Sequence, residues 1–215
     1  MGSSESWWRL TPTLIERGYR VVAVDLPGHG LSDRDHALTV PRTAEAVVSA
    51  VAAETSERPP AVAIGHSFGG LVLAAAAAQL KPELAVYVDA PFAARGGWER
   101  ADAVAEYESD RRARTFETLA SRPYYTERDQ TVEARAAERF DPETAAAIAA
   151  AQGGAWPPAP GSIVLRPDPS DYVGAAAVAE LTARGVEVRS IPGASHSIWR
   201  SHFDEFIAAL PEIFG

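Results

Sequence analysis

The chain has 215 residues, of which 47% are hydrophobic, and its 29 acidic and 20 basic side chains give a formal net charge of −9 at pH 7. This length is typical of one α/β domain with a sizeable apolar core, and the negative charge disfavours nucleic acid or an anionic membrane surface as a partner. The sequence has no cysteine, which excludes disulfides, thiolate nucleophiles and cysteine-ligated metals.

No segment resembles a targeting signal or a membrane span. The N-terminus lacks the basic, apolar and small-residue regions of a signal peptide. No apolar run reaches the length of about 18 residues that a spanning helix needs. These features predict a soluble, cytoplasmic protein, and the sequence contains no signal for an oligomeric state.

Apolar runs with the composition of buried strands alternate with segments of helical periodicity. The expected strands lie at residues 21–25, 61–65, 84–89, 162–166 and 186–191. One expected helix, at 6–17, precedes the first strand, and two others, at 43–54 and 70–80, lie between strands. Strands that alternate with helices are typical of a mostly parallel sheet with helices on both faces. The fold class predicted is therefore α/β.

The pattern changes between residues 91 and 160. A loop is expected at 91–97, amphipathic helices at 100–121 and 127–140, and a third helix from Asp141, which is a suitable N-cap followed by proline in the first turn. Residues 153–161 are rich in Gly and Pro and predict a linker. We therefore expect a core formed by residues 1–90 and 161–215, with residues 91–160 as a helical cap insertion.

The strongest chemical signal is centred on Ser67. It lies in the hexapeptide Gly-His-Ser-Phe-Gly-Gly at residues 65–70, directly after an expected strand and directly before an expected helix. A strand that passes through Gly-x-Ser-x-Gly into a helix is the nucleophile elbow, a strained turn that exposes the serine hydroxyl. Small residues are expected at Gly65 and Gly69, because a side chain there would collide with the neighbouring strand or helix.

A serine hydroxyl becomes a good nucleophile only when a base removes its proton, and an acid must hold that base in one tautomer. His196 follows the last expected strand and is the candidate base. Asp168 and Asp171 follow the preceding strand. The chain order Ser67, Asp171, His196 matches the order serine, acid, histidine in which the triad residues follow such an elbow. Asp89, at the end of the strand after the elbow, is the alternative acid.

Four motifs in the same order resemble the α/β-hydrolase superfamily. Residues 25–33 (Asp-Leu-Pro-Gly-His-Gly-Leu-Ser-Asp) resemble the loop after the family's fourth strand, and residues 65–70 resemble the elbow. Residues 166–171 (Arg-Pro-Asp-Pro-Ser-Asp) resemble the acid loop, in which the aspartate after Ser170 is usually catalytic. Residues 192–196 (Pro-Gly-Ala-Ser-His) resemble the histidine loop.

This resemblance implies a carboxylesterase-like serine hydrolase with Ser67, Asp171 and His196 as its catalytic triad. Such enzymes act on small-molecule esters or related acyl compounds through an acyl-enzyme, and they use no cofactor and no metal. The resemblance also implies that the backbone N–H of Phe68 supplies one donor of the oxyanion hole. Gly2, or a neighbour, is expected to supply the second.

The sequence departs from the family at its start. Relatives begin with two or three further strands, and Met1 corresponds to the segment just after the third of them. We therefore expect an N-terminally truncated sheet in this chain and a longer natural protein.

Two other functions fit the same residues. One is a non-catalytic ligand-binding homologue that keeps the triad residues. The other is a carbon–carbon bond hydrolase or a lyase that uses the same triad.

Overall fold

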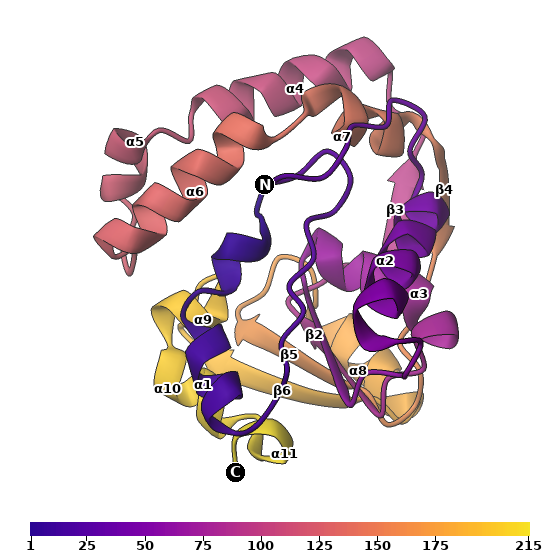
Figure 1. The fold of residues 1–215 in the computed structure, drawn as a ribbon, viewed down its shortest axis with the longest axis vertical. Helices are drawn as coiled ribbons and strands as arrows, with labels where there is room; N and C mark the ends of the chain where they lie inside the picture. Colours follow the sequence, from indigo (N-terminus) through magenta and orange to yellow (C-terminus); the bar gives the residue numbers. More distant parts are fainter. The chain divides into compact units, whose positions relative to one another are not determined.

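A computed structural model describes residues 1–215 (Figure 1). These residues divide into two compact units. The first contains Met1–Val47 and Ala94–Gly154, and the second contains Val48–Ala93 and Ala155–Gly215. Residues 1–47 thus group with most of the predicted cap insertion, whereas our expected core placed them with the sheet. The role of residues 91–160 as a cap stays a prediction.

The second unit is built on a four-stranded parallel sheet. Its strands are β1 (Val62–His66), β2 (Leu84–Val88), β5 (Ile163–Asp168) and β6 (Glu187–Pro192), in the order β1-β2-β5-β6. Val86, Val88, Val164 and Leu165 are completely buried. Strand β2 is apolar throughout and β5 begins with three apolar residues, as expected of a parallel sheet covered on both faces.

Helices pack on this sheet and follow its last strand. Helix α3 (Phe68–Leu80) packs on β1 and β2, and α8 (Ala175–Ala183) packs on β6. Three short helices end the chain: α9 (Ile198–Ser201), α10 (Phe203–Ala208) and α11 (Pro211–Phe214). The parallel α/β arrangement predicted from the alternating pattern is confirmed for this unit.

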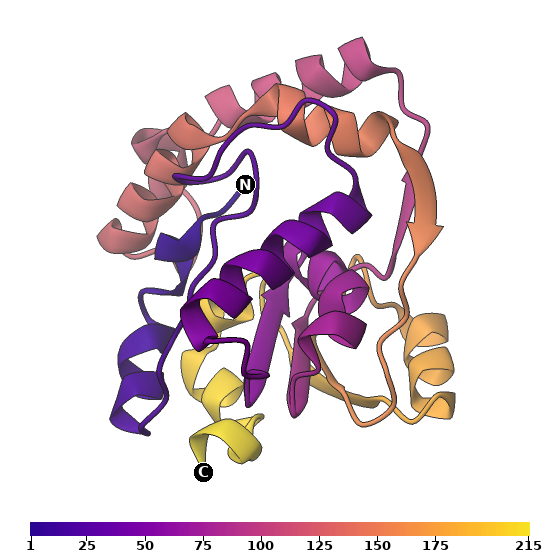
Figure 2. The same cartoon turned by 45° about the vertical axis from the view of Figure 1, so that its right-hand side comes forward.

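The first unit is mainly helical (Figure 2). It contains η1 (Ser4–Trp7), α1 (Leu10–Glu16), α4 (Arg100–Arg112), α5 (Phe116–Ala120), α6 (Glu127–Arg139) and α7 (Pro142–Ala150). Helix α4 packs against α7 and α6, and η1 packs against α6. Helix α2 (Val40–Thr55) begins in this unit and ends in the other.

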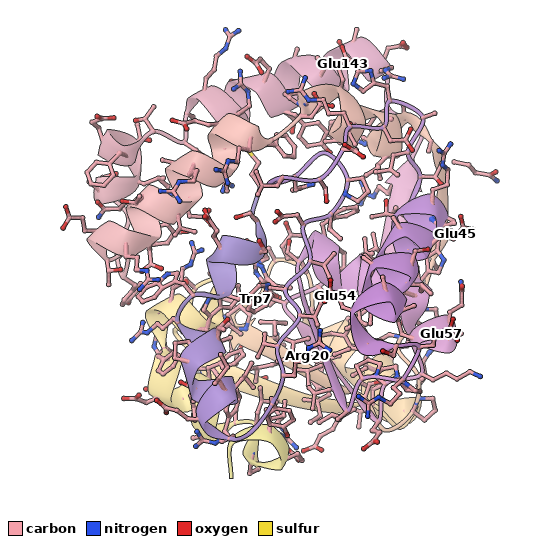
Figure 3. All side chains as sticks on the ribbon, viewed as in Figure 1. Trp7, Arg20, Glu45, Glu54, Glu57 and Glu143 are labelled. Carbon is pink, nitrogen blue, oxygen red and sulfur yellow. The ribbon has the colours of Figure 1, made fainter.

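Polar contacts join the helices of the first unit. The indole N–H of Trp8 donates to Oδ1 of the buried Asp129, at 3.0 Å. Glu143, labelled in Figure 3, lies in the first turn of α7 and pairs with Arg100 of α4 at 3.2 Å. Asp141 caps α7 as predicted, because its carboxylate accepts from the backbone N–H of Thr144 at 3.0 Å.

Three sequence expectations about local structure were wrong. Residues 21–25 form no strand, because a strand requires a hydrogen-bonded neighbour and the four-stranded sheet ends at β1. The expected loop at 91–97 contains β3 (Ala93–Gly96), and the expected linker begins within β4 (Gln152–Ala155). These two strands pair with each other.

None of the helices combines the length and apolar character that a bilayer crossing requires, and even α2 has only 16 residues.

Candidate active site

Ser67 occupies a strained turn between β1 and α3. Its backbone angles are φ 52° and ψ −125°, a positive φ that non-glycine residues rarely adopt. The turn is held from both sides. The N–H of Ser67 donates to the carbonyl of Val88 in β2 at 3.0 Å, and the N–H of Gly70 donates to the carbonyl of Ser67 at 2.9 Å. This is the local geometry predicted for the elbow.

Two glycines make the turn sterically possible, but they are not the pair we expected. A Cβ at Gly65 would lie 2.7 Å from the carbonyl oxygen of Gly69, and a Cβ at Gly70 would lie 2.3 Å from Cβ of Ala90. A Cβ at Gly69 would meet no atom within 4 Å. The close approach of α3 to the chain after β2 therefore requires glycine at 70, and the expected constraint at Gly69 is wrong.

Asp89 follows β2 directly and is almost completely buried, with 1% of its surface exposed. Its φ of 41° turns the chain out of the strand, and its N–H donates to the carbonyl of Leu165 in β5 at 2.8 Å. A buried carboxylate needs polar partners to compensate for lost hydration. Asp89 has one for each oxygen: Ser170 contacts Oδ1 at 2.5 Å, and His196 contacts Oδ2 at 2.6 Å.

His196 lies in the turn after β6 and pairs with Asp89 through Nδ1. Because a carboxylate can only accept, Nδ1 carries the proton, and Nε2 of the neutral ring keeps its lone pair. The His196 side chain is 42% exposed, so its ring remains partly accessible. No hydrogen bond joins the imidazole to the Ser67 hydroxyl in this structure.

The structure places Asp89, and not the expected Asp171, against His196. Asp171 is exposed and makes no hydrogen bond to His196, whose Nδ1 is taken by Asp89. The physical reason lies in residue 170, whose hydroxyl turns inward to Asp89 while the next side chain faces solvent. Asp168 is also not at the site, since its carboxylate pairs with Arg166 at 2.7 Å.

His66, which precedes Ser67, contacts the candidate base His196. Its Nε2 lies 3.0 Å from the backbone carbonyl of His196 and must donate, because a carbonyl only accepts. Its ring lies 4.7 Å from the ring of Trp199 in a T-shaped arrangement. Desolvation, reinforced by the neighbouring His196, lowers the pKa of His66 well below its ordinary value, so this ring stays neutral.

The two expected oxyanion donors lie in different units. Phe68 begins α3 directly after Ser67, where a helix N-terminus can offer a backbone N–H to a developing oxyanion. Gly2 belongs to the first unit. The oxyanion roles of both residues stay predictions.

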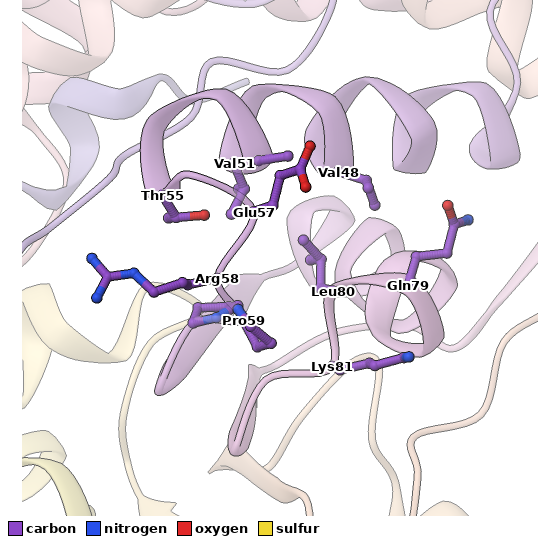
Figure 4. Close-up of a pocket in the computed structure, with 11 residues that line it drawn as sticks. Val48, Val51, Thr55, Glu57, Arg58, Pro59, Gln79, Leu80 and Lys81 are labelled. Carbon is purple, nitrogen blue, oxygen red and sulfur yellow. The ribbon is translucent and has the colours of Figure 1, made fainter.

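A cavity of about 230 Å³ in the second unit lies away from these residues (Figure 4). It is lined by residues from the end of α2, including Val48 and Val51, and by Leu80 and Lys81 at the end of α3. Ser67 precedes the opposite end of this 13-residue helix, roughly 20 Å away at 1.5 Å per residue. The cavity is therefore not the substrate site that Ser67 would serve.

From the sequence, Asp89 was only the alternative acid, and Ser170 had no expected role. One signal in the sequence favoured Asp89, because it directly continues the apolar run of β2 and is followed by Ala90. A carboxylate in such a run must be paired in the folded protein.

Comparisons with known proteins bear on the family and the fold. A model described as the alpha/beta hydrolase family matches residues 1–209. No curated protein shows significant sequence similarity to the chain.

Several solved structures have a similar fold. An esterase from Exiguobacterium antarcticum matches with a TM-score of 0.74 and 14% identity, over 99% of this chain and 88% of that one. The esterase RhEst1 from Rhodococcus sp. ECU1013 matches with a TM-score of 0.71 and 19% identity, over 99% and 86%. An N-formylmaleamic acid deformylase from Pseudomonas putida S16 matches with a TM-score of 0.69 and 18% identity, over 98% and 92%.

Proposed function

Since this chain belongs to the alpha/beta hydrolase family, we propose that it is a serine hydrolase that cleaves a carboxylic ester or a related acyl bond. Ser67 is the nucleophile, His196 the general base and Asp89 the acid of the triad. The observation that carries this proposal is the 2.6 Å hydrogen bond between Asp89 Oδ2 and His196 Nδ1, formed at the edge of the sheet where Ser67 leaves β1.

The first half of the proposed reaction forms an acyl-enzyme. Oγ of Ser67 attacks the acyl carbon while Nε2 of His196 takes the hydroxyl proton. The Asp89 carboxylate holds the Nδ1 proton in place and stabilises the imidazolium that results. Collapse of the tetrahedral intermediate breaks the bond to the leaving alcohol, which receives the proton from Nε2.

The second half restores the enzyme. Water attacks the acyl carbon, its proton passes to Nε2 of His196, and the carboxylic acid leaves as that proton returns to Oγ of Ser67. The N–H of Phe68 binds the oxyanion in both halves, and the second donor expected near Gly2 stays a prediction from the sequence. Loss of one such donor typically costs about 10²–10³ in rate.

The substrate class follows from the chemistry of the site and from the relatives. The solved structures with similar folds include esterases and a deformylase, whose names describe acyl-bond hydrolysis. The negative charge of the chain favours a neutral rather than an anionic partner. We therefore assign a small, mostly apolar ester or acyl compound as the substrate.

Labelling with a fluorophosphonate probe tests this proposal without knowledge of the substrate, because the probe reacts only with an activated serine. We expect one label per chain, located by peptide mapping on Ser67, and none on Ser67→Ala. The matched control is Ser109→Ala, which removes an exposed serine of α4 and should label like the wild type. A folded wild-type protein that takes no label would instead support the non-catalytic ligand-binding homologue.

A further inference from the structure

The loop that follows β5 contacts both the acid and the base of the proposed triad, although it contributes neither. Ser170 touches Asp89, and Tyr172 lies against His196. We propose that Ser170, supported by Tyr172, is a positioning residue that fixes the Asp89–His196 pair for catalysis. This inference rests on the proposed function, because it assigns these two residues a role in the same site.

The direction of the Ser170 hydrogen bond is determined by its neighbours. Oγ of Ser170 accepts hydrogen bonds from the backbone N–H of Val173 at 2.8 Å and from that of Tyr172 at 3.1 Å. The hydroxyl proton therefore points to Asp89 Oδ1, which lies 2.5 Å away and can only accept. A serine hydroxyl held by two backbone donors has one remaining use, which is donation to this carboxylate.

This donation immobilises the Asp89 carboxylate. With Oδ1 bonded to Ser170 and Oδ2 bonded to His196, rotation of the carboxylate would break two short charge-assisted hydrogen bonds. Without Ser170, one oxygen of this buried carboxylate would lack its hydrogen bond, and the plane of the carboxylate could rotate away from the imidazole. Ser170 therefore fixes the plane of the Asp89 carboxylate, with one oxygen directed at Nδ1 of His196.

Tyr172 contacts the other partner. Its ring centroid lies 5.1 Å from that of His196, with the planes inclined by 38°. The Tyr172 side chain is itself half-exposed. The ring of His66 also contacts that of His196, at a centroid distance of 4.4 Å.

The loop is anchored independently of the triad. The buried guanidinium of Arg166 donates to the carbonyl of Val173 at 2.7 Å, and its Nε donates to the hydroxyl of Ser190 at 2.9 Å. Ser190 therefore offers a matched control: a serine that supports the same loop through Arg166 but contacts neither Asp89 nor His196.

The test compares Ser170→Ala, Ser170→Thr and Ser190→Ala by steady-state kinetics on an activated ester such as p-nitrophenyl acetate. For Ser170→Ala we expect kcat to fall about 10- to 100-fold, the range for loss of a hydrogen bond to a charged group, with KM changed less than about twofold. Ser170→Thr keeps the hydroxyl and should retain kcat within about threefold, and Ser190→Ala should do the same. Equal losses in Ser170→Ala and Ser190→Ala would overturn the proposal, since they would indicate a general loosening of the loop.

A spectroscopic measurement makes the inference independent of turnover. The proton between His196 Nδ1 and Asp89 Oδ2 lies in a short hydrogen bond and should resonate far downfield in the NMR spectrum of the intact chain. We expect this resonance in the wild type and in Ser170→Thr, and its displacement or loss in Ser170→Ala. An unchanged resonance in Ser170→Ala would contradict the positioning role.

The two proposals fail in different ways. If the wild type hydrolyses no ester and takes no fluorophosphonate label, the hydrolase function fails, while the downfield proton still decides whether Ser170 orders the pair. If the wild type is active and Ser170→Ala matches it in kcat and in spectrum, only the positioning role fails.

The ring contact of Tyr172 is tested separately by comparing Tyr172→Ala with Tyr172→Phe. We expect kcat to fall about threefold in the alanine variant only.

Discussion

The carboxylate of Asp89 lies 2.6 Å from Nδ1 of His196, across 107 positions of sequence. The two residues reach each other because parallel strands end at the same edge of a sheet: Asp89 follows β2, and His196 follows β6 after the intervening β5. An acid placed after β2 therefore serves the same base as one placed after β5 would. Mutation of Asp89 and of Asp171 therefore distinguishes which aspartate acts as the acid.

We predict that Asp89→Asn lowers kcat by about 10⁴, because an amide cannot hold the imidazole in the required tautomer. Asp171→Asn should keep kcat within about twofold, since Asp171 is exposed and has no contact with His196. Steady-state hydrolysis of an activated ester measures both. The opposite ranking of the two variants would return the acid role to Asp171.

A second prediction exchanges the two groups that face each other at the site. Asp89→Ser alone should abolish most of the activity. Adding Ser170→Asp should raise the acylation rate of that variant about 10- to 100-fold, because Oγ of Ser170 already lies 2.5 Å from the Asp89 carboxylate. Single-turnover acylation by p-nitrophenyl acetate measures the recovery. No gain in the double variant would show that the loop after β5 cannot direct a carboxylate to His196.

A third prediction concerns the stability of the elbow. Gly70→Ala should lower the free energy of unfolding by about 1–3 kcal/mol, because its Cβ would overlap that of Ala90 at 2.3 Å. Gly69→Ala meets no atom within 4 Å and replaces glycine in a helix, so its stability should stay equal or rise by up to about 1 kcal/mol. Urea unfolding with matched m-values checks both. Equal midpoints for the two variants would be inconsistent with the structure.

A fourth prediction follows from His66, whose pKa is lowered well below 6.5 by burial. Below pH 6.5 the unfolded chain binds a proton at this position that the folded chain does not. The contribution of His66 to the free energy of unfolding is therefore complete above that pH and declines as the pH falls. The slope from this residue approaches about 1.4 kcal/mol per pH unit. Urea unfolding at pH 7 and pH 5 should therefore show a smaller decline for His66→Gln, which keeps a donor but does not titrate. His29, whose burial lowers its pKa to about 4, contributes equally to both proteins and cancels in the comparison.

The sheet could largely be predicted from the sequence, because a buried parallel strand carries its own signal. The apolar runs at 61–65, 84–89, 162–166 and 186–191 correspond to β1, β2, β5 and β6 within a few residues. The equally apolar run at 21–25 failed because strand formation also depends on a hydrogen-bonded neighbour, which composition does not encode.

The candidate site was predicted in part. The elbow at Ser67 has a local sequence pattern that dictates its backbone, so the strained turn was foreseeable. The partner of His196 was not, because Asp89 and Asp171 both follow strands that end at the same edge. The choice between them depends on which way the chain turns after β5, where the Ser170 hydroxyl faces inward. The direction of that turn depends on tertiary packing, and the sequence of residues 166–171 does not indicate it.

The contact between Gly70 and Ala90 also constrains how this sequence can diverge. A Cβ at 70 would lie 2.3 Å from the methyl group of Ala90, so the two positions share space for one methyl group. We therefore expect relatives that carry alanine at position 70 to carry glycine at position 90, a covariation between the start of α3 and the residue beside Asp89. Divergence at either position is thus limited by the other, which keeps the nucleophile and the acid at a constant spacing while the surrounding surface changes.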